Sequence, residues 1–362
     1  MSNPVPRPGI MGIDPYVGGE SSLDGRDKVI KLSSNESAFG PSPKAAAAYN
    51  DAAGELHRYP DGDCRALREA LAARHGLDAA RIVCGAGSDE LIGLLCQAYA
   101  GPGDEVLYSE HGFLMYPIAA KAAGASPVFA PEKNLTADVE ALLGQVNDNT
   151  QLLFLANPNN PTGTCLPAEE LWRLCRGLDD GVILVIDAAY AEFVTGEDYS
   201  PGNDLVEGSG NVVMTRTFSK IYGLGGLRLG WAYCPKDIAG VLNRMRGPFN
   251  VSAPAMAAGV AALDDTDFTD NARKHNETWR AWTGERLSDL GLEVTPSAGN
   301  FVLVRFPAGP GRDAEAADGF LKDRGIIVRR MEAYGLGDCL RITIGQEDEM
   351  RALVDTLAAF RE

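Results

Sequence analysis

Two segments of the chain join a continuous apolar stretch to a polar end, and they constrain the fold more than any other feature. Residues 151–163 read QLLFLANPNNPTG, and residues 181–193 read GVILVIDAAYAEF. Strands of this kind, apolar throughout, are typical of a buried parallel sheet. Ligands of α/β proteins bind at the carboxyl ends of such strands, which is where these polar residues lie. The sequence therefore predicts an α/β fold with a functional site at that edge.

The size of the chain indicates two domains. Its 362 residues, of which 45% are hydrophobic, can bury a large core and exceed the usual length of one domain, so we expect one large and one smaller domain. The net charge of −17 repels nucleic acid and anionic membranes. We expect neither as a partner, and an anionic substrate must be attracted by local arginines.

Cysteine and histidine usage gives no support to a metal site. The seven cysteines and four histidines are dispersed, and no CxxC pair occurs. The first residues contain no apolar stretch of signal-peptide length, and no run approaches the ~20 apolar residues of a membrane span. We therefore expect a soluble cytoplasmic protein with reduced thiols, no bound metal and no membrane partner.

The segment MTRTFSKIYGLGGLRLGW, residues 214–231, contains the first candidate for catalysis. A lysine that condenses with an aldehyde cofactor needs shelter from water and a cationic or dipolar environment. A phosphate on that cofactor needs hydroxyls and a guanidinium. Lysines usually lie in solvent, but Lys220 has Thr217, Ser219 and Arg228 close in sequence. This combination predicts a lysine that binds a phosphorylated aldehyde.

A second candidate for phosphate binding begins after residues 82–85. The pattern of a strand, a glycine turn and an amphipathic helix places Gly87, Ser88 and Asp89 at a helix N-terminus, where free N–H groups attract anions. The carboxylates of Asp89 and Glu90 should then point away from the phosphate. An ordinary helix start, with both acids complementing the helix dipole, explains the same residues.

Polar residues at the ends of the two apolar strands are further candidates. Asp187 could hold a protonated pyridine nitrogen, and Tyr190 follows three residues later. Asn160 stands directly before PTG in the other turn. An acid after an apolar strand is also typical of magnesium-binding nucleotidases, but their phosphate loop requires a GK dipeptide, which this sequence lacks.

These motifs, taken in order from PYVGG (residues 15–19) to LRITIG (residues 340–345), resemble fold-type I pyridoxal-phosphate aminotransferases. The lysine segment, of the form SKxxGLxGxRxGW, is most similar to the histidinol-phosphate aminotransferase family. The resemblance implies a large domain with a mostly parallel, seven-stranded type of sheet and a smaller α/β C-terminal domain. We expect an N-terminal arm, rich in Pro and Gly and joined to the small domain, over residues 1–40, the cofactor-binding domain over 41–247 and the small domain over 248–362.

The resemblance also assigns roles around pyridoxal 5'-phosphate. It implies that Lys220 binds the cofactor and moves a proton between substrate and cofactor. Phe113 aligns with an aromatic residue that stacks on the cofactor ring, although a core aromatic explains it equally well. Tyr59, in RYPD, matches a tyrosine that reaches the phosphate of the neighbouring subunit, which implies a homodimer with shared sites. The other cofactor contacts implied are Gly87, Ser88, Asp89, Asn160, Asp187, Tyr190, Thr217, Ser219 and Arg228.

Five residues match substrate positions. Arg341, in LRITIG, corresponds to an arginine that binds the anionic group of the substrate. Arg329 is a second candidate, although its neighbour Arg330 could serve instead, and we assign His111 no role. The remaining three are Tyr16, where Gly18 replaces the usual proline of the motif, Asn35, which an Asx-turn explains about as well, and Asn300.

The family implies transfer of an amino group from a small donor to a 2-oxo acid, and the motifs favour histidinol phosphate with 2-oxoglutarate. A broad-specificity aromatic amino-acid aminotransferase would use the same residues. A decarboxylase acting on threonine phosphate would share the cofactor site and differ in which bond is broken. A cofactor-binding regulator without turnover would need a DNA-binding module, which the acidic composition argues against.

Overall fold

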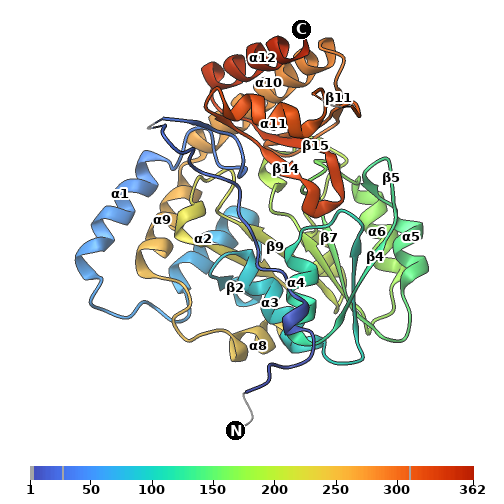
Figure 1. Cartoon of the computed structure of the whole chain (residues 1–362). Helices are drawn as coiled ribbons and strands as arrows, with labels where there is room; N and C mark the ends of the chain where they lie inside the picture. Colours follow the sequence, from blue (N-terminus) through green and yellow to red (C-terminus); the bar gives the residue numbers. More distant parts are fainter. Residues whose placement is uncertain (1–3, 27, 310) are drawn as a thin grey trace.

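A seven-stranded sheet forms the centre of the computed structural model, which describes residues 4–26, 28–309 and 311–362 (Figure 1). All neighbouring strands pair in parallel except β10, which is antiparallel to both neighbours. This confirms the predicted α/β fold with a mostly parallel sheet of seven strands. In spatial order the strands are β2 (Ile82–Gly85), β10 (Gly230–Tyr233), β9 (Val212–Thr217), β8 (Ile183–Asp187), β7 (Thr150–Ala156), β3 (Glu105–Ser109) and β4 (Ser126–Ala130).

Helices cover both faces of this sheet. Leu152 and Phe154 of β7 lie in one apolar core, whereas Leu153 and Leu155 lie in another, because alternate side chains of a strand point to opposite faces. The first face is covered by α3 (Ser88–Tyr99), α4 (Met115–Ala123) and α8 (Lys236–Met245). Residues of α2 (Arg65–His75), α5 (Val139–Gln145), α6 (Ala168–Gly177), α7 (Asn203–Gly208) and α9 (Ala253–Asp264) cover the second, and α1 (Pro43–Ala52) packs on α9.

Local sequence signals explain where these helices begin and end. The hydroxyl of Ser42 accepts a hydrogen bond from the backbone N–H of Ala45, 3.1 Å away, and so caps α1. Ser252 caps α9 in the same way. Helices α2 and α4 end at Gly76 and Gly124, which adopt the left-handed conformation that glycine tolerates best.

A second, smaller sheet lies above the first in Figure 1. Its four antiparallel strands are, in spatial order, β11 (Glu293–Thr295), β12 (Phe301–Arg305), β15 (Leu336–Thr343) and β14 (Arg329–Met331). Three helices contribute to its separate apolar core: α10 (Thr266–Asp289), α11 (Ala314–Lys322) and α12 (Glu347–Arg361). Gln346 and Glu349 form a capping box that starts α12.

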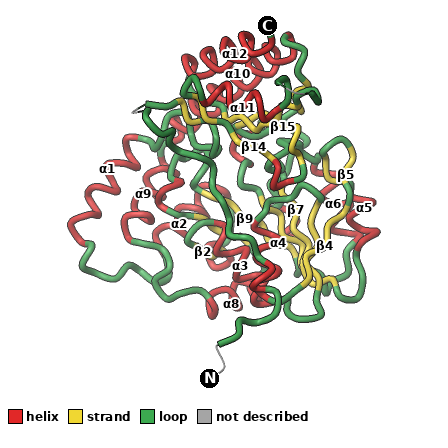
Figure 2. The backbone as a smooth tube through the Cα atoms, in the orientation of Figure 1, coloured by secondary structure: helices red, strands yellow, loops and turns green. Residues whose placement is uncertain are grey.

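The N-terminal segment runs from the large sheet's helices to the small sheet (Figure 2). Near its 3-10 turn η1 (Ile10–Gly12), Arg7 donates to the backbone oxygen of Ala122 at 2.9 Å, and Lys121 donates to that of Gly12 at 3.0 Å. Further on, β1 (Ile30–Lys31) pairs in parallel with β13 (Ile326–Ile327). The chain between these anchors therefore spans the space between the two sheets.

The remaining regular elements are short. A hairpin consists of β5 (Glu132–Lys133) and β6 (Thr136–Ala137). The other 3-10 turns are η2 (Ala53–Glu55), η3 (Ala79–Arg81), η4 (Ala191–Phe193), η5 (Gly225–Leu227) and η6 (Glu332–Tyr334). Among the residues with a described structure, no helix has the length and apolar character needed to span a membrane.

Candidate active site

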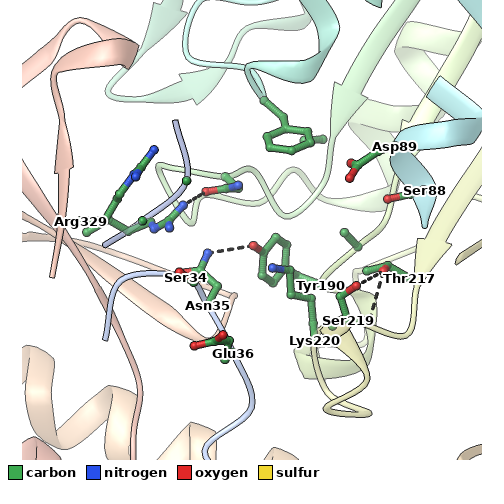
Figure 3. A pocket seen from close by; sticks show the side chains of 18 of the residues that line it. Ser34, Asn35, Glu36, Ser88, Asp89, Tyr190, Thr217, Ser219, Lys220 and Arg329 are labelled. Carbon is green, nitrogen blue, oxygen red and sulfur yellow. Dashed lines mark hydrogen bonds between the residues drawn. The ribbon is translucent and has the colours of Figure 1, made fainter. Parts of the chain in front are cut away.

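A cavity of about 350 Å³ opens at the carboxyl ends of β7, β8 and β9, facing the small sheet. It collects side chains from the N-terminal segment, the large sheet and strands β14 and β15 (Figure 3). The residues singled out from sequence that line it are Tyr16, Asn35, Ser88, Asp89, Phe113, Asn160, Asp187, Tyr190, Thr217, Ser219, Lys220, Arg228, Arg329 and Arg341.

Asp187, at the end of β8, is the buried carboxylate of the cavity. The hydroxyl of Tyr116 donates to its Oδ2 at 2.8 Å, while Oδ1 has no partner among the described residues. Burial raises the pKa of Asp187 to about 6, although the hydrogen bond from Tyr116 acts in the opposite direction. One carboxylate oxygen is thus held in place, and the other is buried without a hydrogen-bond donor among the described residues.

Lys220 lies at the middle of the cavity beside Tyr190 (Figure 3). Its Nζ is 5.5 Å from the centre of the Tyr190 ring, and no described carboxylate lies within ion-pair distance of it. The Tyr190 hydroxyl accepts a hydrogen bond from Nδ2 of Asn35 at 2.8 Å. Asn35 has a left-handed φ of 54° and is also bonded to Thr343, so it makes tertiary contacts rather than an Asx-turn.

Hydroxyls and a guanidinium gather at one end of the cavity. The Thr217 hydroxyl donates to Oγ of Ser219 at 2.9 Å. Arg228, in the left-handed conformation, donates to the backbone oxygen of Gly225 at 3.0 Å and to Oδ2 of Asp89 at 2.9 Å. We expected the Asp89 carboxylate to point away from this site, but it lines the cavity because the Arg228 guanidinium attracts it.

Glycines allow close backbone packing next to Ser88 and Arg228, at the hydroxyl-rich end of the cavity. A Cβ on Gly230 of β10 would lie 2.4 Å from the backbone nitrogen of Ser88, so only glycine fits there. Gly87 has a φ of 84° and precedes the first residue of α3. It does not line the cavity, but a Cβ on it would lie 2.6 Å from Nη2 of Arg228. Glu90, as expected, points elsewhere and accepts from the backbone of Ala86.

Two arginines occupy the opposite end. Arg329 and Arg341 are paired across β14 and β15, so their side chains leave the same face of the small sheet. Arg341 is buried and donates to the backbone oxygen of Ser33 at 3.0 Å and to Oδ1 of Asn160. Arg329 donates to the backbone oxygen of Val17 at 2.6 Å.

Neither arginine is neutralised by an acid of the described chain. Burial lowers the pKa of Arg341, because the charged guanidinium has lost water without gaining a carboxylate. Arg330, by contrast, forms ion pairs with Glu315 and Glu332 and does not line the cavity. Of the two neighbouring candidates, Arg329 therefore faces the site.

Two other predicted residues lie outside the cavity wall. Nδ2 of Asn300 donates to the backbone oxygens of Asn35 and Glu36, both at 3.1 Å, so Asn300 supports the segment that lines the site. Tyr59 is 84% exposed and stacks on Phe249, with 4.7 Å between ring centres. Within one chain it contributes nothing to the cavity.

Other residues at the site carried no functional signal in the sequence. Tyr116 is fully buried and orients Asp187, but from sequence it is an ordinary tyrosine near the start of a helix. Glu36, Ser33 and Tyr334 also line the cavity. Their positions depend on how the N-terminal segment and η6 approach the large sheet, which local patterns do not report.

The cavity suits the cofactor expected from the sequence. An amine lies between a hydroxyl-rich end, which includes the N-terminus of α3, and an arginine-rich end. The buried Asp187 has one free oxygen in the cavity wall. These features match a group with a phosphate, an aldehyde and a protonated ring nitrogen, together with an anionic substrate.

The comparisons with known proteins agree with this geometry. A family model described as aminotransferase class I and II matches residues 27–357, so the chain belongs to this family. It is 63% identical to a histidinol-phosphate aminotransferase of Paramagnetospirillum magneticum, over 99% of both chains. It is 61% identical to one of Rhodospirillum rubrum, over 99% of this chain and 97% of the relative. The resemblance to the histidinol-phosphate aminotransferase family is thereby confirmed.

A solved structure supports the same assignment. The crystal structure of histidinol-phosphate aminotransferase from Sinorhizobium meliloti, in complex with pyridoxal-5'-phosphate, superimposes with a TM-score of 0.86 at 33% identity. The match covers 92% of this chain and 91% of that one. The predicted fold-type I architecture is therefore confirmed.

Proposed function

We propose that the chain is a pyridoxal-phosphate-dependent aminotransferase that transfers the amino group of histidinol phosphate to 2-oxoglutarate. The observation that carries the proposal is the pair Arg329 and Arg341, which lie across the cavity from the phosphate-binding end and lack acidic partners in the described chain. Two such arginines suit a dianionic phosphate and also accept the carboxylate of 2-oxoglutarate. The names of the relatives support the same substrate.

The residues of the cavity would contact three parts of the cofactor: its phosphate, its ring nitrogen and the faces of its ring. Thr217, Ser219, Arg228, Ser88 and the N-terminal N–H groups of α3 would hold the phosphate. Asp187 would accept a hydrogen bond from the ring nitrogen. When bound, the cofactor supplies an electron sink for the bond that breaks at the α-carbon of the substrate. Phe113, Asn160 and Tyr190 complete the wall around the ring.

The protein's own part in the reaction is proton transfer and orientation. Nζ of Lys220, once released by the incoming amine, would act as general base at the substrate α-carbon and general acid at the cofactor. Tyr116 keeps Asp187 in place, and Asn35 does the same for Tyr190. Lys220→Ala should therefore reduce turnover by roughly a hundredfold to ten-thousandfold. A Lys220→Ala protein that transaminates at close to the normal rate would exclude this role.

A spectroscopic experiment separates the substrate alternatives. The cofactor-loaded protein is mixed separately with glutamate, histidinol phosphate, phenylalanine and tyrosine, and absorbance reports conversion of the cofactor from its aldehyde to its amine form. Rapid conversion by glutamate and histidinol phosphate alone is expected. Comparable conversion by phenylalanine or tyrosine would indicate a broad aromatic enzyme. No conversion by any amine would favour the decarboxylase.

We also propose a homodimer in which Tyr59 completes the partner's site. Tyr59, Phe249 and Leu56 expose large apolar surfaces on one chain, as interface residues do before assembly. Mixing inactive Lys220→Ala and Tyr59→Ala subunits tests this arrangement. A mixed dimer contains one site with both residues intact, so random exchange should restore about a quarter of the normal sites. No recovery, with exchange verified, would show that Tyr59 acts elsewhere.

The remaining proposals concern organisation and location. We propose an arm at 1–40, a cofactor domain at 41–247, a small domain at 248–362 and a cytoplasmic enzyme. The separate apolar cores of the two sheets support two domains. Because α9 packs on α1 and α2, limited proteolysis that releases a fragment beginning near residue 265 would move the second boundary. Cleavage near residue 248 would support it as proposed.

A further inference from the structure

A buried acid and histidine lie just outside the cavity, in residues that the proposed reaction does not use. Glu132 of β5 accepts two hydrogen bonds from His111, from the backbone N–H at 3.1 Å and from Nδ1 of the ring at 2.8 Å. The side chains are only 2% and 12% exposed, respectively. A carboxylate that holds both the backbone and the ring of one residue fixes its φ/ψ and its rotamer together.

The segment that Glu132 holds forms part of the cavity wall. His111 lies between β3 and α4, two residues before Phe113, whose ring lines the cavity. The backbone oxygen of His111 accepts a hydrogen bond from Nδ2 of Asn159 at 3.1 Å. Asn159 precedes Asn160, which also lines the cavity. His111 is thus linked to two residues of the cavity wall, to Phe113 along the chain and to Asn160 through Asn159.

Glu132 is itself anchored by the small sheet. The turn of its hairpin carries Leu135, which packs against a cluster around β12, β14 and β15: Leu303, Met331, Leu336 and Cys339. The backbone oxygen of Leu135 also accepts a hydrogen bond from the Thr164 hydroxyl at 2.8 Å. The hairpin therefore bridges the sheet that carries the arginines and the loop that carries Phe113.

The charges around His111 favour its protonated form. Burial lowers the pKa of His111, but the hydrogen bond and charge of Glu132, together with Glu110, raise it above its usual value overall. The other charged groups facing this region are Glu293 and Arg305, which line the adjoining groove. An imidazolium bound to a buried carboxylate is a stronger restraint than a neutral pair.

We propose that His111 and Glu132 form a positioning pair that holds Phe113 and Asn160 in place for the cofactor ring. The proposal rests on the proposed function, because it assigns the cofactor to this cavity. His111 does not touch the cavity itself, so it acts through the loop. Through Glu132, the position of the Phe113 ring depends on the β5–β6 hairpin, which packs against the small sheet.

Cofactor affinity is the direct test, and it does not depend on turnover. Pyridoxal phosphate is titrated into cofactor-free wild-type protein and into His111→Gln, Glu132→Gln and the double variant, with Kd read from absorbance. Each single substitution should raise Kd by roughly tenfold, and the double variant should be no worse than either. His275→Gln, which removes a half-buried histidine bonded to Gly345 far from the loop, is the matched control and should leave Kd unchanged.

Two further measurements separate positioning from general destabilisation. In a Phe113→Leu background, His111→Gln should raise Kd by less than it does in the wild type, since only the support of Asn160 through Asn159 remains to be lost. Only four histidines occur, so the imidazole resonances can be assigned by substitution and titrated by NMR. His111 should titrate at higher pH in the wild type than in Glu132→Gln.

Three results of the affinity measurements would overturn the proposal: unchanged Kd in folded single variants, additive losses in the double variant, or an undiminished effect of His111→Gln in the Phe113→Leu background. An unshifted His111 titration in Glu132→Gln would do the same. A failure of the proposed function looks different, because wild-type protein itself would then fail to bind the cofactor or to transaminate.

Discussion

The two ends of the cavity use arginine in opposite ways. Arg341 is buried, with 7% of its surface exposed, and its partners are neutral oxygens of Asn160 and Ser33. Arg228 is half exposed, and its charge is already paired with Asp89. A buried cation without an acid is destabilised until an anion arrives, whereas an exposed pair is screened by water. Under the proposed function, the Arg341 end would bind an anion selectively, and at the Arg228 end the incoming phosphate would replace Asp89 as the partner of the guanidinium.

This difference has a structural origin in the two positions. Arg341 lies on β15, which has a strand on each side, and its guanidinium is bonded to the N-terminal segment at Ser33, so its side chain has little freedom. Arg228 lies in a loop at the edge of the large sheet and reaches Asp89 on the first turn of α3. Substitutions at the two ends should consequently differ in size.

The largest effect is expected from Arg341→Ala. Removal of one member of a buried, hydrogen-bonded charge pair costs about 2–5 kcal/mol. At about 1.4 kcal/mol per tenfold, kcat/KM for histidinol phosphate should fall by roughly 30-fold to several thousandfold. Arg341→Lys keeps the charge but not the fork, so it should recover only part of the loss. Steady-state kinetics with both substrates measure the effect.

Arg330→Ala is the matched control for this experiment. It removes an arginine from the same small sheet that is already paired with Glu315 and Glu332, so kcat/KM should change little. If Arg330→Ala impaired catalysis as much as Arg341→Ala, the role of Arg341 could not be attributed to its burial without an acidic partner.

A slightly smaller effect, on the free energy of unfolding, is expected from the ionisation of Asp187, and it depends on pH. Because burial raises the pKa of Asp187 from 3.8 to about 6, the folded protein binds this proton more tightly than the unfolded chain. The resulting stability is present below about pH 4 and is lost as pH rises through about 6. The loss is on the order of 3 kcal/mol, at about 1.4 kcal/mol per pKa unit.

Urea unfolding of cofactor-free protein at several pH values measures this dependence. The stability of wild type relative to Asp187→Asn should fall between about pH 4 and pH 7, since the amide does not titrate. Bound cofactor should abolish the trend, because a protonated ring nitrogen favours the ionised carboxylate. Parallel curves for the two cofactor-free proteins would show that Asp187 ionises in the folded state as readily as in the unfolded chain.

The sheet and the sequence-local part of the site could be predicted because their signals are short-range. The apolar strands β7 and β8 required burial on both faces, and each placed its polar residue at the carboxyl edge. The lysine segment carried Thr217 and Ser219 within a few residues of Lys220. Thr217 and Ser219 are near Lys220 for this reason alone, whereas Arg228, eight residues on, returns to the site because the chain turns at η5 before β10.

Contacts that depend on how distant elements meet could not be predicted. Tyr116 reaches Asp187 only because α4 packs across the sheet, and Asn300 supports Asn35 only because the N-terminal segment crosses the small sheet. The choice of Arg329 over Arg330 follows from the register of β14, in which Arg329 lies opposite Arg341. A single residue of slippage would have exchanged the two side chains.

The smallest effect tests the exposed end. Asp89→Asn should remove the carboxylate that competes with a phosphate for Arg228, so the affinity for pyridoxal phosphate should rise. An exposed ion pair contributes about 0.2–1 kcal/mol, which corresponds to an increase of roughly 1.4- to 5-fold. Titration of cofactor-free protein at low and high salt measures it, and the difference should shrink at high salt. Weaker binding by Asp89→Asn would mean instead that Asp89 orients the guanidinium, so that the exposed end, like the buried one, depends on a fixed arginine.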